Sequence, residues 1–319
     1  MRSPRETGAT TDLAGGGTAV VVVRDLRMVY GDREAVRSID LDVRRGEIFA
    51  FLGPSGAGKT TTVEILEGYR HRSGGVVSVL GADPESAGRD WRARIGVVLQ
   101  QSEPEPSLTV RECLRLYAGY YERPRPIDGT IALVGLADRA DVRGRHLSGG
   151  QKRRLDVALA LVGDPELIFL DEPTTGIDPA ARRSAWGIIA GLRDLGKTVV
   201  VTTHYVEEAD ALADRIAILA AGRIVATGTS RTLAGRDPAT TRISFTLPPE
   251  TRLGDLPEPA RGGATLDDAR RVSLRSTVPM VVLGALAPWA EEHGCPLRDI
   301  EVHRPSLEDI YLELTQGAR

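Results

Sequence analysis

The hydrophobic residues of this chain follow two alternating patterns. Short apolar runs bounded by glycine, proline or charged residues are typical of buried β-strands, and they alternate with stretches whose apolar residues have helical spacing. Strands are expected at 19–30, 46–53, 74–81, 93–101, 165–173, 197–204 and 215–228, and helices at 59–69, at 179–196 and after His204. This alternation predicts an α/β fold with a mostly parallel sheet covered by helices on both faces.

Two parts of the chain depart from this alternation. From about residue 105 to 161 the apolar residues keep helical spacing with few strand signals, which predicts a helical insert. The first 18 residues are polar, rich in Gly and Thr and without periodicity or a signal-peptide core, so they are expected to be a disordered tail. The expected organisation is therefore a tail at 1–18 and a main domain at 19–235 that contains the insert.

The remaining residues, 236–319, are expected to form a small α+β accessory domain. Its first part, 240–264, is rich in Pro, Gly and Thr and predicts an edge strand followed by a loop. Its later elements are expected to be a strand at 270–277, a packed amphipathic helix at Val278–Ala290 and a strand near Ile300–His303. A final helix is expected after a capping box formed by Ser306 and Asp309.

Composition narrows the functional classes. The 319 residues carry a net charge of −3, whereas a nucleic-acid-binding domain usually has a basic excess. No segment reaches the roughly 18 uninterrupted apolar residues of a membrane span, and the best candidate, Val278–Ala290, contains Pro288. The two cysteines, Cys113 and Cys295, form neither a CxxC pair nor a Cys/His cluster, so a reducing cytoplasm is favoured over disulfide or zinc chemistry.

A glycine-rich loop follows the strand at 46–53 and opens the helix at 59–69. Its residues are Gly53, Pro54, Ser55, Gly56, Ala57, Gly58, Lys59, Thr60 and Thr61, in the phosphate-binding pattern G-x-x-x-x-G-K-[ST]. Glycines let backbone N–H groups turn toward phosphate oxygens, and the helix N-terminus adds partial positive charge. Lys59 is expected to bridge the β- and γ-phosphates and Thr60 to ligate Mg²⁺, because the flanking strand and helix disfavour a chance glycine loop.

The apolar strand at 165–173 ends in two carboxylates, Asp171 and Glu172. Asp171 is expected to hold Mg²⁺, mostly through water, and Glu172 to polarise the water that attacks the γ-phosphate. Acidic residues at a strand end are often only solvated, so the chemical interpretation depends on the phosphate loop upstream.

Three other candidates lie at or near strand ends. Tyr30 offers an aromatic face for stacking on adenine, with a core tyrosine as an equal alternative. Gln100, with Gln101 beside it, offers an amide oxygen to Mg²⁺ or water. His204 ends the strand after the one that carries Asp171, which places it at the sheet edge where ligands of open α/β sheets gather. A histidine that only makes a structural hydrogen bond is the alternative.

A second Ser-Gly-Gly turn opens another helix at Ser148, which is a good N-cap residue. The residues after the cap are Gly149, Gly150 and Gln151, followed by the basic residues Lys152, Arg153 and Arg154. The two glycines leave backbone N–H groups bare for an anion. Taken alone, this stretch favours an ordinary capped helix with a solvated basic face.

Together these motifs resemble, in order and spacing, the nucleotide-binding domain of ABC transporters over about Ala19 to Ser230. The resemblance assigns Tyr30 to the A-loop, 53–61 to Walker A and Gln100 to the Q-loop. It assigns Leu147–Gln151 to the LSGGQ signature, with Ser148, Gly149, Gly150 and Gln151 meeting the partner's ATP. It assigns Asp171 and Glu172 to Walker B with its catalytic glutamate, Asp178 to the D-loop and His204 to the switch histidine. It implies an α/β P-loop NTPase core with a mostly parallel sheet, an antiparallel β edge and a helical insert, plus the small α+β C-terminal domain. Departures at Ser55 and Ile177 remove no phosphate donor or metal ligand, so an active ATPase is expected.

The resemblance also implies that each nucleotide site needs two copies of the domain. In this family two domains pack head to tail, so each ATP lies between the phosphate loop of one copy and the signature turn of the other. ATP closes the homodimer, and hydrolysis to ADP and phosphate lets it open and move attached membrane subunits. The implied cofactors are ATP and Mg²⁺, with no nucleic acid.

The C-terminal stretch Glu301–Thr315 resembles the end of ATP-binding subunits of bacterial drug and antibiotic exporters of the daunorubicin-resistance, ABC-2 type. These subunits pair with a separately encoded integral membrane permease. The resemblance implies ATP-driven export of a drug, antibiotic or lipid-like compound, from a peripheral position at the cytoplasmic face of the cell membrane. The helical insert around Glu105–Arg123 is the expected docking surface for the permease.

Three alternatives stay open. An importer subunit shares all of this chemistry, although the roughly 84 residues after Gly235 are fewer than the longer β-rich domain of sugar importers. A soluble ABC ATPase acting on nucleic acid or ribosomes is disfavoured by the single cassette and the absence of zinc-binding cysteine sets. A small-molecule kinase with the same loop would need no signature turn.

Overall fold

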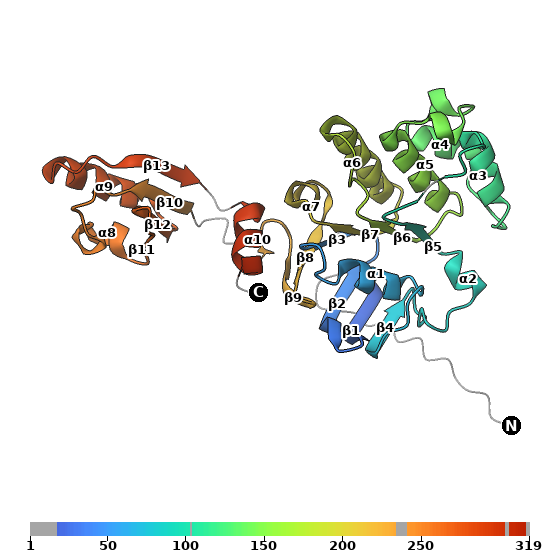
Figure 1. Cartoon of the computed structure of the whole chain (residues 1–319), viewed down its shortest axis with the longest axis horizontal. Helices are drawn as coiled ribbons and strands as arrows, with labels where there is room; N and C mark the ends of the chain where they lie inside the picture. Colours follow the sequence, from blue (N-terminus) through green and yellow to red (C-terminus); the bar gives the residue numbers. More distant parts are fainter. Residues whose placement is uncertain (1–17, 103, 234–240, 304–305, 317–319) are drawn as a thin grey trace. The chain divides into compact units, whose positions relative to one another are not determined.

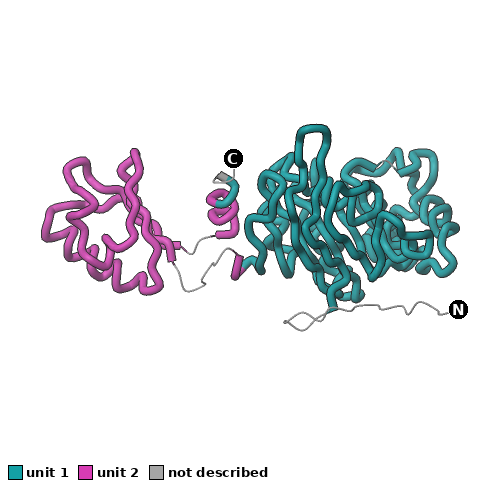
Figure 2. The backbone as a smooth tube through the Cα atoms, turned by 90° about the horizontal axis from the view of Figure 1, so that it is seen from below, with its two compact units in different colours: residues 1–230, 314–319 teal, residues 231–313 magenta. Residues whose placement is uncertain are grey.

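The computed structural model describes residues 18–102, 104–233, 241–303 and 306–316. It divides into two compact units, one of residues 1–230 and 314–319 and one of residues 231–313 (Figure 2). Apart from Thr18, the expected tail at 1–18 lies outside the described residues. Within the described part of the chain, no helix has the length and apolar character needed to cross a membrane.

A six-stranded sheet forms the centre of the first unit (Figure 1). Its strands are β5 (Ile95–Val98), β6 (Leu167–Asp171), β7 (Thr198–Thr203), β3 (Ile48–Leu52), β8 (Arg215–Ala220) and β9 (Arg223–Gly228), in this spatial order. All neighbouring pairs are parallel except β8 and β9. Every residue of β3, β6 and β7 is buried, as expected for parallel strands covered on both faces. Their carboxyl ends therefore meet at one edge of the sheet.

A smaller antiparallel sheet packs against this centre. It contains β2 (Arg33–Arg44), β1 (Ala19–Tyr30) and β4 (Gly74–Val79), in this spatial order. Strand β2 was not expected, because charged residues outnumber apolar ones in its sequence. Its buried residues, among them Val36, Leu41 and Val43, join a core cluster that includes Phe49 and Phe51 of β3. This packing holds the start of β2 close to the glycine loop.

Helices surround the central sheet and form the insert. Around the sheet lie α1 (Lys59–Leu66), α2 (Arg89–Arg92), α6 (Pro179–Asp194) and α7 (Val206–Leu212); the insert contains α3 (Val110–Ala118), α4 (Ile127–Leu133), α5 (Gly149–Leu161) and the short turns η1 (Ala137–Arg139) and η2 (Gly144–His146). The helical nature of the insert, drawn in green in Figure 1, is as predicted. Leu155 and Ala158 of α5 are fully buried, so this helix is anchored in the core.

The second unit contains a four-stranded antiparallel sheet and helices of different lengths. Its elements are β10 (Thr241–Thr246), η4 (Leu253–Asp255), α8 (Glu258–Arg261), β11 (Thr265–Leu266), β12 (Arg271–Ser276), α9 (Pro279–Glu292), β13 (Arg298–His303) and the first part of α10 (Leu307–Gln316), whose residues from Leu314 onward are assigned to the first unit. Its core includes Phe245, Leu286 and Trp289. The capping box before α10 is confirmed, because Ser306 N–H donates to Asp309 Oδ2 over 2.7 Å and Asp309 N–H to Ser306 Oγ over 3.1 Å.

One strand prediction in this unit is wrong. Strand β10 was expected at the edge of its sheet, but the spatial order is β11-β12-β10-β13. Ile243 and Phe245 of β10 are completely buried between β12 and β13. The Pro- and Gly-rich composition that suggested an edge belongs to the loop after the strand, whereas the strand itself alternates apolar and polar residues.

Candidate nucleotide-binding site

The glycine loop joins β3 to α1, and packing explains where glycine is required. At Gly58, which caps α1, φ is +102°, and a Cβ there would lie 2.6 Å from the carbonyl oxygen of Ala35. At Gly53 a Cβ would lie 2.3 Å from the carbonyl oxygen of Leu219. Both distances are far below van der Waals contact, so only glycine lets the loop lie this close to β2 and β8.

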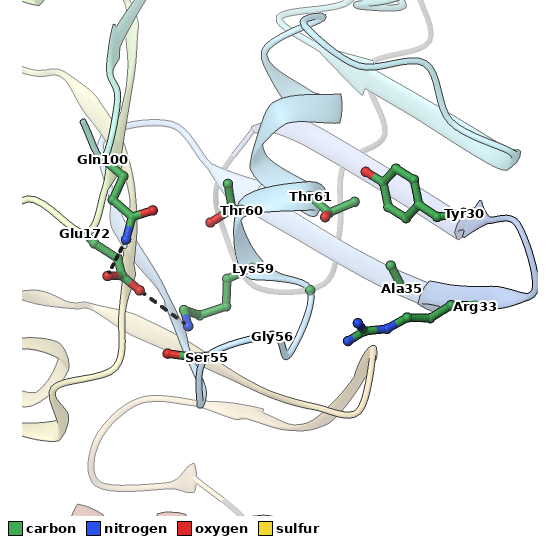
Figure 3. A pocket seen from close by; sticks show the side chains of 11 residues that line it. Tyr30, Arg33, Ala35, Ser55, Gly56, Lys59, Thr60, Thr61, Gln100 and Glu172 are labelled. Atoms are coloured by element: carbon green, nitrogen blue, oxygen red, sulfur yellow. Dashed lines mark hydrogen bonds and ion pairs between the residues drawn. The ribbon is translucent and has the colours of Figure 1, made fainter. Parts of the chain in front are cut away.

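A cavity of about 450 Å³ opens over this loop (Figure 3). Its lining residues are Tyr30, Arg33, Ala35, Ser55, Gly56, Gly58, Lys59, Thr60, Thr61, Gln100 and Glu172. The cavity brings together residues from β1, the glycine loop, the end of β5 and the end of β6. Arg33 and Ala35 were not predicted; they lie at the start of β2, and the alternation of buried apolar residues further along β2 is the signal that could have found them.

Lys59 lies at the base of the cavity and is almost fully buried. Its Nζ donates to the carbonyl oxygens of Gly53 (2.8 Å) and Pro54 (3.1 Å) and lies 3.7 Å from Glu172 Oε1. Burial lowers the pKa of the Lys59 ammonium, while the negative charges of Glu172 and Asp171 oppose this shift. The ammonium is therefore held on the loop that would surround a phosphate.

Asp171 and Thr60 form an oxygen-rich corner beside Lys59. Thr60 Oγ1 donates to Asp171 Oδ2 over 3.2 Å, and Thr202 Oγ1 also donates to this carboxylate. Burial raises the pKa of Asp171, and the hydrogen bonds from Thr202 and Thr60 only partly oppose this rise. A buried carboxylate next to a hydroxyl offers the hard oxygen ligands that Mg²⁺ prefers together with substrate phosphates, so these residues fit that ion.

Glu172 is the point where three predicted residues converge, and Lys59, 3.7 Å from its Oε1, is one of them. Its Oε2 accepts a hydrogen bond from Gln100 Nε2 over 3.0 Å, as Figure 3 shows, and its Oε1 lies 3.4 Å from His204 Nδ1. The Glu172 N–H donates to the carbonyl oxygen of Thr202 (3.1 Å) and to its Oγ1 (2.9 Å). The carboxylate is thus oriented from several sides at the edge of the cavity.

Tyr30 lines the opposite end of the cavity. Its side chain is 39% exposed, so the alternative of a core tyrosine is wrong. The Arg70 guanidinium carbon lies 5.3 Å from the ring centroid, within the range of a cation–π contact. Arg70 is itself bound by Glu64 over 2.6 Å, and this pair restricts the ring next to the cavity.

The remaining predicted residues do not line this cavity. Ser148 caps α5 with a complete capping box: its Oγ accepts from Gln151 N–H (3.3 Å), and Gln151 Oε1 accepts from Ser148 N–H (2.9 Å). Ser148 and Gly149 are exposed to solvent. Asp178 caps α6 by accepting from the N–H groups of Ala180 and Ala181. A single copy of the chain therefore leaves the Ser-Gly-Gly turn outside its own cavity.

The basic stretch after this turn corrects a prediction. It was expected to be a solvated face, but the Arg153 side chain is only 11% exposed. Its guanidinium donates to the backbone carbonyl oxygens of Leu99, Asp171 and Pro173. In the sequence this residue is indistinguishable from its neighbours Lys152 and Arg154, because only the tertiary fold decides which of the three points inward.

The fold and the cavity define a P-loop nucleotide-binding protein. Residues 36–175 match the family described as ABC transporter, and residues 241–306 match the family described as ABC transporter domain-containing protein-like, C-terminal domain. The chain is 36% identical over 306 residues to Nod factor export ATP-binding protein I of Cupriavidus metallidurans, covering 93% of this chain and 98% of that protein. It is 37% identical over 297 residues to a daunorubicin resistance ATP-binding protein of Streptomyces coeruleorubidus, covering 91% and 94%.

Solved structures with a similar fold are also ATP-binding cassettes of ABC transporters. A dimeric ATP-binding cassette with bound ADP and phosphate has a TM-score of 0.59 and 27% identity, and the match covers 66% of this chain and 98% of the cassette. An ABC transporter subunit from Clostridium perfringens gives a TM-score of 0.61 and 27% identity, covering 67% and 89%. The chain belongs to the ABC transporter ATP-binding proteins, and it binds and hydrolyses ATP. The predicted P-loop α/β fold class is confirmed.

A buried carboxyl close to the site gives a prediction about stability. Glu67 at the end of α1 is 9% exposed, and burial, followed by the nearby charges of Asp171 and Glu64, raises its pKa to about 8 from 4.5. Between pH 4.5 and 8 the folded protein keeps a proton that the unfolded chain has released, so this group lowers stability as the pH rises. Glu67→Gln is expected to raise the melting temperature by a few degrees at pH 8 and to change it little at pH 5.

This is measured by thermal unfolding in EDTA without nucleotide, from pH 5 to 8.5. Glu122→Gln, at an exposed carboxylate, is the matched control and should show no pH-dependent gain. A Glu67→Gln gain that is equal at both ends of this pH range would show that the carboxyl is not the source of the effect.

Proposed function

We propose that this chain is the ATPase subunit of an exporter that moves a drug, antibiotic or lipid-like compound through a separate membrane permease. The observation that carries this proposal is similarity over nearly the whole chain, second unit included, to proteins named for Nod factor export and daunorubicin resistance. The subunit would act as a peripheral protein at the cytoplasmic face of the cell membrane. The proposed organisation is the cassette at 19–235 followed by the accessory domain at 236–319.

Within one copy, the geometry supports a division of roles. Tyr30 would stack on the adenine, the loop N–H groups and Lys59 would bind the phosphates, and Thr60, Asp171 and Gln100 would hold Mg²⁺. A Mg²⁺ ion held by these residues would neutralise negative charge on the phosphates. Glu172 would accept a proton from the attacking water, and His204, 3.4 Å away, would help to orient the reacting groups.

Two copies would complete each site. The Ser-Gly-Gly turn at 148–150 is solvent-exposed or half-buried and carries bare N–H groups at the start of a 13-residue helix, yet it lies outside its own cavity. Related cassettes have been solved as dimers, one of them with ADP and phosphate. A head-to-tail homodimer would place this turn, together with Asp178 at the start of α6, against the γ-phosphate of the partner's ATP.

The permease would dock beside Gln100, between the insert and the core. A cavity of about 920 Å³ there is lined by Gln100, Gln101 and Tyr117, among others. Large apolar side chains are exposed around it, including Tyr69 (79%) and Tyr120 (65%). Exposed aromatic residues around a concave surface are typical of protein interfaces. Because Gln100 donates a hydrogen bond to Glu172, movement of a permease segment docked beside Gln100 would shift the hydrolytic carboxylate.

This docking surface is tested with Tyr120→Glu. The variant should keep its ATPase activity without the permease, because Tyr120 does not line the nucleotide cavity, and should lose roughly tenfold in affinity for the permease. The measurement is co-purification from cells that co-express the proposed permease. Met280→Glu, at a 76% exposed apolar residue of the second unit, is the control and should co-purify normally. Wild-type binding by Tyr120→Glu, or membrane association of the chain without that protein, would contradict the proposal.

A further inference from the structure

Arg153 lies in the first turns of α5 but points away from solvent. Its Nη1 donates to Leu99 O over 2.5 Å, its Nη2 to Asp171 O over 2.7 Å and its Nε to Pro173 O over 2.9 Å. One side chain therefore holds two separate segments, the chain after β5 and the chain after β6. Asp156, one turn later on α5, lies 3.8 Å from Nη1 and supplies a nearby negative charge.

The three carbonyl groups that Arg153 binds belong to residues that are next in sequence to Glu172 or to its partner Gln100. Asp171 and Pro173 are the residues on either side of Glu172, and Leu99 directly precedes Gln100, whose amide donates to Glu172. Glu172 itself has φ of +44°, a left-handed conformation that is strained for a residue with a Cβ. Such a conformation persists only when the surrounding structure imposes it. Arg153 fixes the peptide groups on both sides of this strained residue.

The geometry requires a guanidinium. Three different nitrogen atoms reach three carbonyl oxygens, whereas a lysine ammonium is a single donor centre that cannot occupy all three positions. The acceptors are backbone groups, so they are present whatever side chains these positions carry. Loss of the guanidinium would leave the partly buried carbonyl oxygens of Asp171 and Pro173 without this donor and would let the turn at Glu172 relax.

We propose that Arg153 is a positioning residue that holds the strained turn at Glu172 and the segment before Gln100, and so links the helix of the Ser-Gly-Gly turn to the hydrolytic carboxylate. The inference rests on the proposed role of Glu172 as the base. It adds a connection between two proposed sites: α5 is capped by Ser148, which would meet the partner's nucleotide, and Arg153 anchors the same helix beside its own copy's Glu172. Binding of the partner's nucleotide by the Ser-Gly-Gly turn would thereby affect the position of Glu172, and so the rate at which the copy's own ATP is hydrolysed.

The test uses Arg153→Lys and Arg153→Met in the full chain. Because the nucleotide cavity does not include Arg153, ATP affinity should stay within about threefold of wild type. The rate constant kcat should fall roughly 10- to 100-fold for Arg153→Lys, as expected for a misplaced catalytic group, and further for Arg153→Met. Arg115→Lys, the same change at an exposed arginine of α3, should leave both quantities unchanged. If Arg153→Met does not fold, Arg153→Lys alone decides.

A double-mutant comparison separates positioning from general damage. If Arg153 acts through Glu172, adding Arg153→Lys to Glu172→Gln should not lower the residual single-turnover rate further, because the group being positioned is already gone. A wild-type kcat for Arg153→Lys, or equal fold losses with and without the Glu172 carboxylate, would overturn the inference. Normal turnover by Glu172→Gln alone would instead overturn the proposed role of Glu172, so the two failures are distinguishable.

Discussion

Glu172→Gln is expected to slow ATP hydrolysis by roughly 10²- to 10⁴-fold, the usual contribution of a general base, while ATP binding is retained. Glutamine has nearly the same shape but cannot accept the proton of the attacking water. It can still hydrogen-bond to Gln100 and Thr175, which contact the native carboxylate at 3.0 and 3.1 Å. The measurement is steady-state phosphate release together with the equilibrium binding of a fluorescent ATP analogue.

The same variant should accumulate as an ATP-bound dimer, because closure is retained while the step that opens the dimer is blocked. Size-exclusion chromatography with light scattering should show a doubled mass with ATP and a monomer with ADP. The matched control is Glu207→Gln, the same change at an exposed carboxylate of α7, which should hydrolyse ATP normally. Turnover by Glu172→Gln at the wild-type rate would show that another group accepts the proton.

Much of this site could be predicted from the sequence because its signals are local. Lys59 and Thr60 follow a glycine loop between an apolar strand and a helix, and Asp171 and Glu172 end a buried run. Parallel strands in one sheet then bring their carboxyl ends together without further information. His204 has no other predicted site residue close to it in the sequence. Its Nδ1 nevertheless lies 3.4 Å from Glu172 Oε1, because the two residues follow neighbouring parallel strands.

The parts that failed depend on tertiary packing. Arg33 and Ala35 line the cavity only because β2 pairs with β1 and returns to the glycine loop, and β2 carries too many charged residues to show a clear strand run. Arg153 and its neighbour Lys152 are both half-buried basic residues on one helix turn, yet it is the Arg153 guanidinium that binds the backbone carbonyl oxygens of Leu99, Asp171 and Pro173. Strand β10 looks like an edge because its loop is rich in proline, while its true position depends on β13, some 50 residues later.

Ser148→Arg is expected to abolish ATP-driven dimerisation and to reduce hydrolysis by roughly 10²- to 10³-fold, the effect of removing donors from a charge-stabilising site. An arginine at the N-cap places a long side chain where the partner's γ-phosphate would approach the bare N–H groups of Gly149 and Gly150. Ser148 does not line the cavity of its own copy, so ATP binding to the monomer should be unchanged. Loss of dimerisation with unchanged ATP binding by the monomer would therefore show that Ser148 acts on the partner's nucleotide and not on the nucleotide of its own copy.

The substitution also removes a helix cap, and this loss must be distinguished from blocked closure. Losing the Ser148 cap should cost about 1 kcal/mol of stability. Ser306→Arg provides the control, since Ser306 makes the same kind of capping box before α10 in the second unit. It should lose similar stability yet still dimerise. The decisive comparison places each change in the Glu172→Gln background, where the dimer is trapped. If the Ser148 variant still gives a doubled mass with ATP, the Ser-Gly-Gly turn does not bind the partner's nucleotide; if only the Ser306 variant does, the turn is the second half of the site.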